Sequence, residues 1–343
     1  MKKFSLFFLI PLLLSSCSTN KVRISSFIYA DDDIFIEEMS KNLLSSFHYG
    51  DIDYHSYNAT RSQLNQNNQI IKEIEDNNPD ILLVNLVDRL ASKSIVEKAK
   101  KHDVPIIFFN REPLSEDITG ENNIFYVGTD GSYEGKAQAQ IFDSLVKSNA
   151  NSYLASKYDK NKDGVIQLAL VKGEQGHQDS EQRSNNCLLG LKELNYDYEI
   201  LQSTFCDWTS ETSFTEFEKI YLNNLDENGT SKIELVLSNN DAMALGVIDY
   251  LKTLPIYNKD IAIEDQFFPI IGVDATNVAL KSIKNNELSG TVQNDYKVQV
   301  ELIYKLACKI LNIHYDSSLE DISLNKKIYY TKGTIITKDY LTK

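Results

Sequence analysis

The sequence alternates short apolar runs with longer amphipathic stretches, and this alternation limits the folds that the chain can adopt. The expected strands are Val22–Tyr29, Ile81–Leu86, Pro105–Phe109, Phe125–Val127, Val165–Val171, Leu235–Leu237, Pro269–Val273 and Gly290–Val292. The helical stretches between them include Ile34–Phe47, Leu64–Asp76, Ser92–His102, Tyr133–Val146, Asp179–Leu194, Ser213–Leu225 and Asn240–Leu254. Such a pattern is typical of parallel sheets covered by helices on both faces. With 343 residues, the chain is long enough for two doubly wound α/β lobes.

Polar residues follow the expected strands at the points where the strands end. They are Asp31 to Asp33, Asn85, Asn110, Asp130, Asn239, Asn240, Asp274, Asn294 and Asp295. In open α/β sheets, ligands bind outside the carboxyl ends of the strands. Asn and Asp at a strand-to-helix turn most often cap the next helix, and this reading is favoured for any single residue. The set as a whole favours a site for a polyhydroxylated ligand.

The net charge is strongly negative, with a formal value of -14. An acidic chain repels phosphate backbones and anionic lipid headgroups, so we expect no nucleic-acid partner. A neutral ligand such as a sugar is compatible with this charge.

The first residues predict export. A basic start, Met1 to Lys3, precedes an apolar run over Phe4–Leu14, which is too short for a membrane-spanning helix but suits a signal peptide. The run ends in Leu14-Ser15-Ser16-Cys17, which resembles a bacterial lipobox. We therefore expect a signal peptide over 1–16, a lipid on Cys17, a tether over 17–20, and anchoring to the bacterial cell membrane, facing a periplasm or the outer surface. The alternative is an ordinary signal with an unrelated cysteine.

The remaining cysteines are Cys187, Cys206 and Cys308. Three thiols cannot all pair within one chain. A bridge between Cys187 and Cys206 stays open, but buried free thiols are the favoured reading.

Six segments, in this order and spacing, resemble the bacterial periplasmic galactose/glucose-binding proteins of ABC sugar importers. They are Asn85–Asp88, Phe108–Pro113, Tyr126–Asp130, Lys172–His177, Asn239–Ala244 and Gly272–Ala275. The resemblance implies a type I periplasmic-binding-protein fold, in which two Rossmann-like lobes are joined by three hinge crossings. It places lobe one at 21–128 plus 295–327 and lobe two at 130–293 plus 328–343, with hinges near 128–130, 293–295 and 328–332.

The same resemblance implies a set of sugar-contacting residues. They are Asp33, Phe35, Asn110, His177, Asp179, Arg183, Trp208, Asn240, Asp274 and Asn294. Their chemistry suits a pyranose, because carboxylates accept hydrogen bonds, Arg donates them and Asn does both. We expect Phe35 and Trp208 to cover the C–H faces of the sugar, one from each lobe. The alternatives are that Trp208 packs in a core and that Asp179 only caps a helix.

A second constellation predicts a structural calcium site. Asp159, Asn161, Asp163 and Gly164 match the opening of an EF-hand loop, followed by the Val165 carbonyl and Gln167. The twelfth position is Leu170 rather than Glu, and the resemblance implies that Glu234 supplies the missing carboxylate. The alternative is a polar turn without a metal.

The expected function is high-affinity binding of a monosaccharide, glucose or galactose, and its delivery to an ABC transporter permease by a monomeric receptor that is not an enzyme. One alternative is a sugar receptor for a chemoreceptor or sensor kinase. Another is a glycosidase that uses Asp33 with Asp179 or Asp274, because such enzymes need two carboxylates. A sugar-responsive repressor is set aside, since a signal peptide stands where its DNA-binding domain would be.

Overall fold

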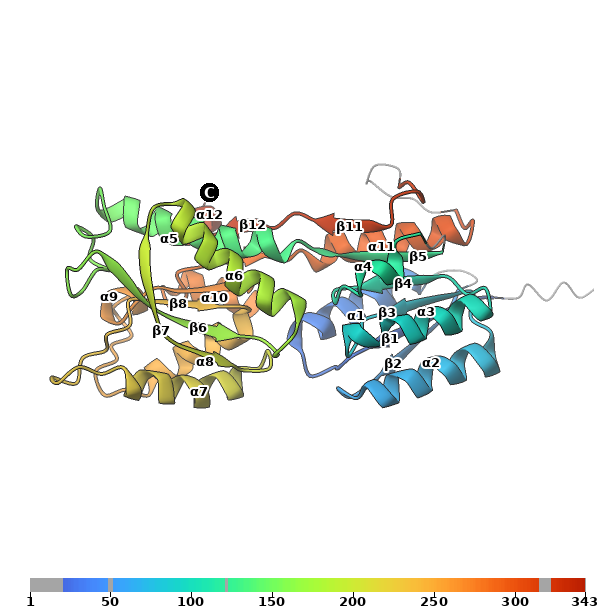
Figure 1. Ribbon diagram of the computed structural model, residues 1–343, viewed down its shortest axis with the longest axis horizontal. Helices are drawn as coiled ribbons and strands as arrows, with labels where there is room; N and C mark the ends of the chain where they lie inside the picture. The colour runs from blue at the N-terminus through green and yellow to red at the C-terminus, as the bar shows by residue number, and fades with distance from the viewer. Residues whose placement is uncertain (1–20, 49–51, 121–122, 315–321, 343) are drawn as a thin grey trace, which may run out of the picture.

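The protein folds into two lobes that lie side by side along its long axis (Figure 1), each built on one six-stranded sheet. The computed structural model describes residues 21–48, 52–120, 123–314 and 322–342. The expected α/β architecture of two Rossmann-like lobes is confirmed.

The first lobe is a parallel sheet with the strand order β11-β5-β4-β3-β1-β2. Its strands are β1 (Val22–Ile28), β2 (Ile52–Asn58), β3 (Ile81–Val84), β4 (Ile106–Phe109), β5 (Ile124–Thr129) and β11 (Ile328–Thr331). Its helices are α1 (Ile34–Phe47), α2 (Gln63–Asn77), η1 (Arg89–Ala91), α3 (Ser92–Lys101), α4 (Ser115–Ile118) and α11 (Tyr296–Ile310). One core lies under α1 and α11, and a second lies under α2 and α3 on the opposite face. Burial on both faces explains why these strands are almost wholly apolar.

The second lobe has the strand order β12-β10-β9-β8-β6-β7, and only β12 runs antiparallel to its neighbour. Its strands are β6 (Val165–Lys172), β7 (Asp197–Phe205), β8 (Leu235–Ser238), β9 (Ile270–Asp274), β10 (Gly290–Gln293) and β12 (Thr334–Ile336). Its helices are α5 (Gly131–Asn149), α6 (Gln178–Glu193), α7 (Ser210–Asn223), α8 (Asp241–Lys252), α9 (Ile263–Gln266), α10 (Asn277–Lys284) and α12 (Lys338–Leu341). Here too a core lies on each face of the sheet, with α5 and α6 on one side and α7 and α8 on the other.

All eight predicted strands are present, and their bounds shift by at most two residues. Sequence analysis did not find the four edge strands, β2, β7, β11 and β12. Neither β2 nor β7 has a fully buried residue, and β11 and β12 are short and only partly buried, so none has the apolar run that marks the central strands.

The chain passes between the lobes three times: between β5 and α5, between β10 and α11, and between β11 and β12. The predicted boundary at the third crossing was wrong, because residues 328–331 form β11 in the first lobe. Their register with β5, from Ile328 opposite Tyr126 to Thr331 opposite Thr129, is parallel. The buried ring of Tyr329 packs on the core under α1 and α11. The last crossing therefore lies after Thr331.

Two further expectations concern cysteines and the membrane. Cys187, Cys206 and Cys308 are buried free thiols, and Cys17 lies outside the described residues. Within the described ranges, no helix has the length and apolar character needed to cross a bilayer.

Candidate functional site

All ten residues predicted to contact a sugar line a single cavity between the two lobes, together with Tyr29 and Arg111. From the first lobe come Asp33 and Phe35, which follow β1, and Asn110, which follows β4. The remaining seven come from the junctions after β6, β7, β8, β9 and β10, and they are His177, Asp179, Arg183, Trp208, Asn240, Asp274 and Asn294. The cavity therefore lies where the carboxyl ends of both sheets meet.

Several cavity residues also cap helices, so capping and a position at the cavity are compatible, although α6 is capped by His177 and not by Asp179. Asp33 Oδ1 accepts hydrogen bonds from the backbone N–H groups of Phe35 and Ile36 at the start of α1. Asn240 Oδ1 accepts one at 2.9 Å from the N–H of Met243 at the start of α8. Capping fixes the orientation of these side chains at the edge of the cavity, where Asp33 Oδ2 also accepts from the Tyr29 hydroxyl and Asn240 Nδ2 donates to the Trp208 carbonyl.

Three cavity residues have a strained backbone conformation. Asn110, Trp208 and Asp274 have positive φ angles of 60°, 66° and 119°. Residues other than glycine seldom adopt such angles, and each instance costs on the order of 1–3 kcal/mol. The strain turns these three side chains toward the space between the lobes at the ends of their strands.

Trp208 reaches the cavity because Gly173 leaves room for its ring. A Cβ atom on Gly173 would lie 2.2 Å from the nearest indole carbon, which is a severe overlap. The indole meets the ring of His177 edge-on at 4.9 Å, and its Nε1 has no hydrogen-bond partner among the described residues. Phe35 approaches from the other lobe and packs edge-on against Tyr296 at 5.9 Å. Both expected aromatic walls therefore line the cavity, one from each lobe.

Arg183 is held within the second lobe by several acceptors. Its Nε donates to Glu134 Oε2 at 2.7 Å, its Nη1 donates to the Asn239 carbonyl at 2.8 Å, and its Nη2 lies 3.6 Å from Asp179 Oδ2. Glu134 is fully buried, and burial raises the pKa of this carboxyl. Because the guanidinium has five donor hydrogens, it can hold this network and still face the cavity.

Burial shifts the protonation of the cavity groups toward their neutral forms. It raises the pKa of Asp179, and it raises the pKa of Asp274 well above the ordinary range, although Arg183 opposes both shifts. It also lowers the pKa of His177 well below its usual value, helped by Arg111 and Arg183. His177 Nδ1 accepts from the N–H of Asp179, so the neutral ring carries its proton on Nε2 as a donor.

The cavity therefore combines acceptors, donors and apolar rings without an excess of one kind. Asp33, Asp179 and Asp274 offer carboxyl oxygens, and three Asn residues offer both a donor and an acceptor. The aromatic rings supply apolar surface. Such a set can replace the water around a ring-shaped polyol whose hydroxyl groups each donate and accept.

Sequence reasoning missed Tyr29, Arg111 and, behind the cavity, Asp241. Tyr29 directly follows β1, and Arg111 directly follows a predicted contact, so their positions after strands were the available signal. The Asp241 carboxyl is fully buried and accepts from Thr291 Oγ1 at 2.7 Å and from the N–H of Thr276 at 2.9 Å. Asp241 lies within the segment Asn239–Ala244, but nothing in the sequence distinguishes it from an ordinary residue in the first turn of a helix.

The predicted metal-binding loop folds as a tight turn around Asp159. The carboxylate of Asp159 is buried and accepts from the N–H groups of Lys162 at 2.6 Å and Gly164 at 3.0 Å, both of which have positive φ. Asn161 Nδ2 donates to Asp163 Oδ2 at 2.8 Å. Hydrogen bonds within the loop thus close the turn.

Glu234 meets this loop from the segment before β8. Its carboxylate accepts from the N–H groups of Lys160 at 2.6 Å and Gln167 at 3.1 Å, and from the Tyr153 hydroxyl. Gln167 Nε2 in turn donates to Asp163 Oδ2 at 3.0 Å. In the described part of the chain, no group of three or more His, Cys, Asp or Glu side chains is clustered closely enough to hold a metal ion. Hydrogen bonds connect the loop to Glu234, and the carboxylates of Asp159, Asp163 and Glu234 accept from protein donors.

Comparisons with known proteins agree with this architecture. The sequence profile of the periplasmic binding protein domain matches residues 25–314. The D-galactose/methyl-galactoside binding periplasmic protein MglB of Haemophilus influenzae is 32% identical over 289 residues, which cover 83% of this chain and 80% of MglB. The ribose import binding protein RbsB of Bacillus subtilis is 24% identical over 264 residues, covering 76% and 68% of the two chains. A Bacillus halodurans ABC transporter solute binding protein, solved with myo-inositol, superposes with a TM-score of 0.74 at 22% identity, covering 95% and 98%.

The buried Asp241 carboxyl gives a pH prediction. Burial raises its pKa from 3.8 to about 7, so between these values the folded protein holds a proton that the unfolded chain releases. The free energy of unfolding therefore falls as the pH rises from about 4 to about 7, by up to ~1.4 kcal/mol per pH unit from this group. Asp241→Asn removes that contribution, and thermal or urea unfolding across this range measures it.

The matched control is Asp249→Asn, on the same helix but 62% exposed. We expect it to keep the wild-type pH profile. A profile for Asp241→Asn that runs parallel to the wild type would contradict the assignment.

Proposed function

The chain belongs to the family of periplasmic binding proteins, and from this premise we propose that it binds a hexose, glucose or galactose, between its lobes and delivers it to an ABC transporter permease. The family match spans residues 25–314, and the type I fold expected from the sequence is confirmed. The relative at 32% identity is a D-galactose/methyl-galactoside binding protein, which favours a hexose.

One observation carries the proposal: ten residues, spread from Asp33 to Asn294, converge on a single interlobe cavity. Hydrogen bonds to charged groups contribute roughly 1.5–3 kcal/mol each, so a few of them offset the loss of a sugar's hydration. The two aromatic side chains supply the apolar surface that covers C–H groups. A cavity of this composition suits a neutral ring with several hydroxyl groups better than a charged or wholly apolar ligand.

Binding requires the lobes to move relative to each other. The cavity residues come from both lobes, and in the described part of the chain three short connections join these lobes. A sugar that bonds first to one lobe and then to the other binds the closed state more tightly, so it shifts the population toward closure. The closed receptor is the form that we expect the permease to recognise.

We propose no chemical step for this site. The Asp33 carboxylate already accepts two helix N–H groups, and its Oδ2 accepts the Tyr29 hydroxyl at 2.6 Å. Hydrogen bonds of this kind hold a carboxylate in place as an acceptor. His177 is neutral and donates from Nε2, which suits recognition of a hydroxyl group.

The hexose proposal predicts the effect of removing single carboxyl groups. Asp33→Asn and Asp274→Asn keep the side-chain shape, but each replaces a carboxyl oxygen, which can accept a hydrogen bond, with an amide NH₂ that can only donate. We expect each to weaken hexose binding by about thirtyfold, or ~2 kcal/mol, in titration calorimetry. Trp208 is the only tryptophan of the chain, so hexose should also change the intrinsic fluorescence of the wild type.

The control is Asp31→Asn, an exposed neighbour that does not line the cavity. Its affinity should equal that of the wild type. Unchanged affinity in both cavity variants would place these carboxyls outside the site, and a wild type that binds no hexose would end the proposal.

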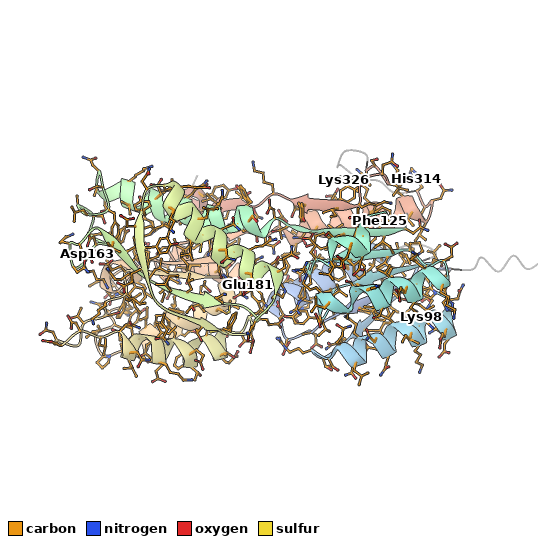
Figure 2. The ribbon with its side chains drawn as sticks, in the orientation of Figure 1. Lys98, Phe125, Asp163, Glu181, His314 and Lys326 are labelled. Carbon is orange, nitrogen blue, oxygen red and sulfur yellow. The ribbon has the colours of Figure 1, made fainter. Side chains whose placement is uncertain are left out.

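We also propose that the loop from Asp159 to Gln167, with Glu234, binds structural Ca²⁺. Calcium prefers six to eight oxygen ligands in flexible geometry. The loop supplies carboxyl, amide and backbone oxygens, and Glu234 comes to it from more than sixty residues downstream. Burial raises the pKa of Glu234, and the nearby Asp159 carboxylate raises it further, so a cation would relieve this repulsion. Figure 2 shows Asp163 at the outer end of the second lobe, far from the interlobe cavity, which agrees with a purely structural role.

Calcium should therefore raise the melting temperature of the wild type, and chelator should reverse the change. At a calcium concentration 100 times the dissociation constant, the stabilisation is about 2.7 kcal/mol. Asp163→Asn should remove most of this response in a thermal-shift assay. Asp226→Asn is the control, because Asp226 also forms a tight turn in this lobe, with the N–H groups of Asn228 and Thr230. Equal calcium responses in both variants would argue against the site.

We further propose that the mature protein is anchored by a lipid on Cys17, although this residue lies outside the described part of the chain. The first described strand begins at Val22, so the tether between lipid and lobe is short. Cys17→Ala should release the protein from the membrane fraction and abolish fatty-acid labelling. Retention of both label and membrane association in the variant would contradict the proposal.

A further inference from the structure

An ion-pair cluster links the two lobes beside the cavity. Glu174 follows β6 in the second lobe, and both of its carboxylate oxygens face the Arg111 guanidinium of the first lobe. Arg111 Nη2 donates to Oε1 at 3.1 Å, and Nη1 lies 3.1 Å from Oε2, which is a two-point, fork-like pairing. Arg61, also in the first lobe, places Nη1 3.6 Å from the same Oε1. We call Arg61, Arg111 and Glu174 the interlobe clasp.

Contacts inside the first lobe alone orient the Arg111 side chain, independently of Glu174. Its guanidinium stacks on the Tyr29 ring at 3.6 Å from the centroid, and Nη1 also donates to the Val87 carbonyl at 2.7 Å. Stacking and a carbonyl bond hold the planar fork in one orientation, so little conformational entropy is lost when the carboxylate docks. The first lobe therefore presents a prepared receptor for Glu174.

The clasp is connected to a predicted sugar contact. The ring of Tyr29 packs against Arg111, and the hydroxyl group of the same residue donates a hydrogen bond to Asp33 Oδ2 at 2.6 Å. Tyr29 and Arg111 both line the cavity, so only the Tyr29 side chain separates Asp33 from the clasp. Because Tyr29 is hydrogen-bonded to Asp33 and packs on Arg111, a movement of Asp33 on ligand binding also displaces Arg111, and the reverse holds.

The clasp is partly removed from water. The Arg111 side chain is 6% exposed, and that of Glu174 is 28% exposed. Salt weakens such a pair less than a fully exposed pair. Because Glu174 is still in contact with solvent, the attraction nevertheless depends on the salt concentration. Because the partners belong to different lobes, the pair is made when the lobes close and is lost when they separate.

We propose that the interlobe clasp contributes directly to sugar affinity by stabilising the closed state, with Arg111 as a positioning residue between the ligand and Glu174. This inference rests on the proposed function, since it assigns part of the affinity of that site to contacts outside the ligand. A hexose is uncharged, so its own hydrogen bonds depend only weakly on ionic strength. Affinity for a neutral sugar should therefore fall as salt weakens the clasp.

The test is titration calorimetry with glucose and galactose at 0.05 and 0.5 M NaCl, between which the Debye length changes about threefold. We expect the wild-type dissociation constant to rise roughly fivefold across this range. Glu174→Gln should bind about tenfold more weakly at low salt and show less than a twofold salt effect. Arg111→Lys, which keeps the charge but loses the fork, should be intermediate.

The matched control is Glu181→Gln. Glu181 pairs with Lys172 at 3.1 Å inside the second lobe, so its loss should leave both affinity and salt dependence at wild-type values. Figure 2 shows Glu181 on the side of that lobe that faces the first one, so the control samples a similar environment. Wild-type affinity in Glu174→Gln, or an unchanged salt dependence in that variant, would overturn the proposal.

A second measurement separates this inference from the proposed function. If no hexose binds the wild type, the proposed function fails, and small-angle X-ray scattering of the sugar-free protein decides on the clasp alone. A larger radius of gyration for Glu174→Gln than for the wild type and Glu181→Gln would support the clasp. Equal radii for the three proteins would overturn it.

Discussion

The orientation of the two parallel sheets is the constraint on which the site depends. In each lobe the parallel strands end toward the neighbouring lobe, so the junctions after β1, β4, β6, β8, β9 and β10 deliver polar residues to the same cavity. Residues as distant in sequence as Asp33 and Asn294 therefore become neighbours without long functional loops. The three crossings between lobes keep the two sheet ends opposed while leaving only short segments to bend.

Placing so many polar groups in a buried region carries a free-energy cost that the network around Arg183 partly offsets. Glu134 and Asp179 both lie against this one guanidinium, and the field of Arg183 also reaches Asp274. Burial nevertheless keeps the pKa values of these carboxyls raised, so they remain poorly compensated by the protein alone. Hydroxyl groups supply donors without adding charge, which makes a polyol an effective partner for carboxyls in such surroundings.

Sequence alone predicted the fold class and the central strands from local signals, and the family resemblance gave ten of the twelve residues that line the cavity. Apolar runs mark buried strands, and polar residues directly after them mark the sheet ends. The edge strands β2 and β7 were not predicted, because half-exposed strands contain no continuous apolar run. Residues 328–331 were assigned to the wrong lobe because parallel pairing with β5 is a long-range contact. Arg111 was overlooked for a related reason: its partners Tyr29 and Glu174 are distant in sequence, and only folding brings the three together.

The clasp also explains how an acidic chain can close its own cleft. With 49 acidic and 35 basic residues, two lobes of this chain repel each other at long range unless cations are placed where they meet. Arg61 and Arg111 both project from the first lobe toward Glu174, and Arg61 is also held by Asp32 at 3.0 Å. Two cations facing one carboxylate reverse the local sign of the interaction between lobes. Closure then depends on two contributions, the uncharged contacts through the sugar and the ion pairs beside it. Because both stabilise the same closed state, a change in either one alters the measured affinity for the sugar.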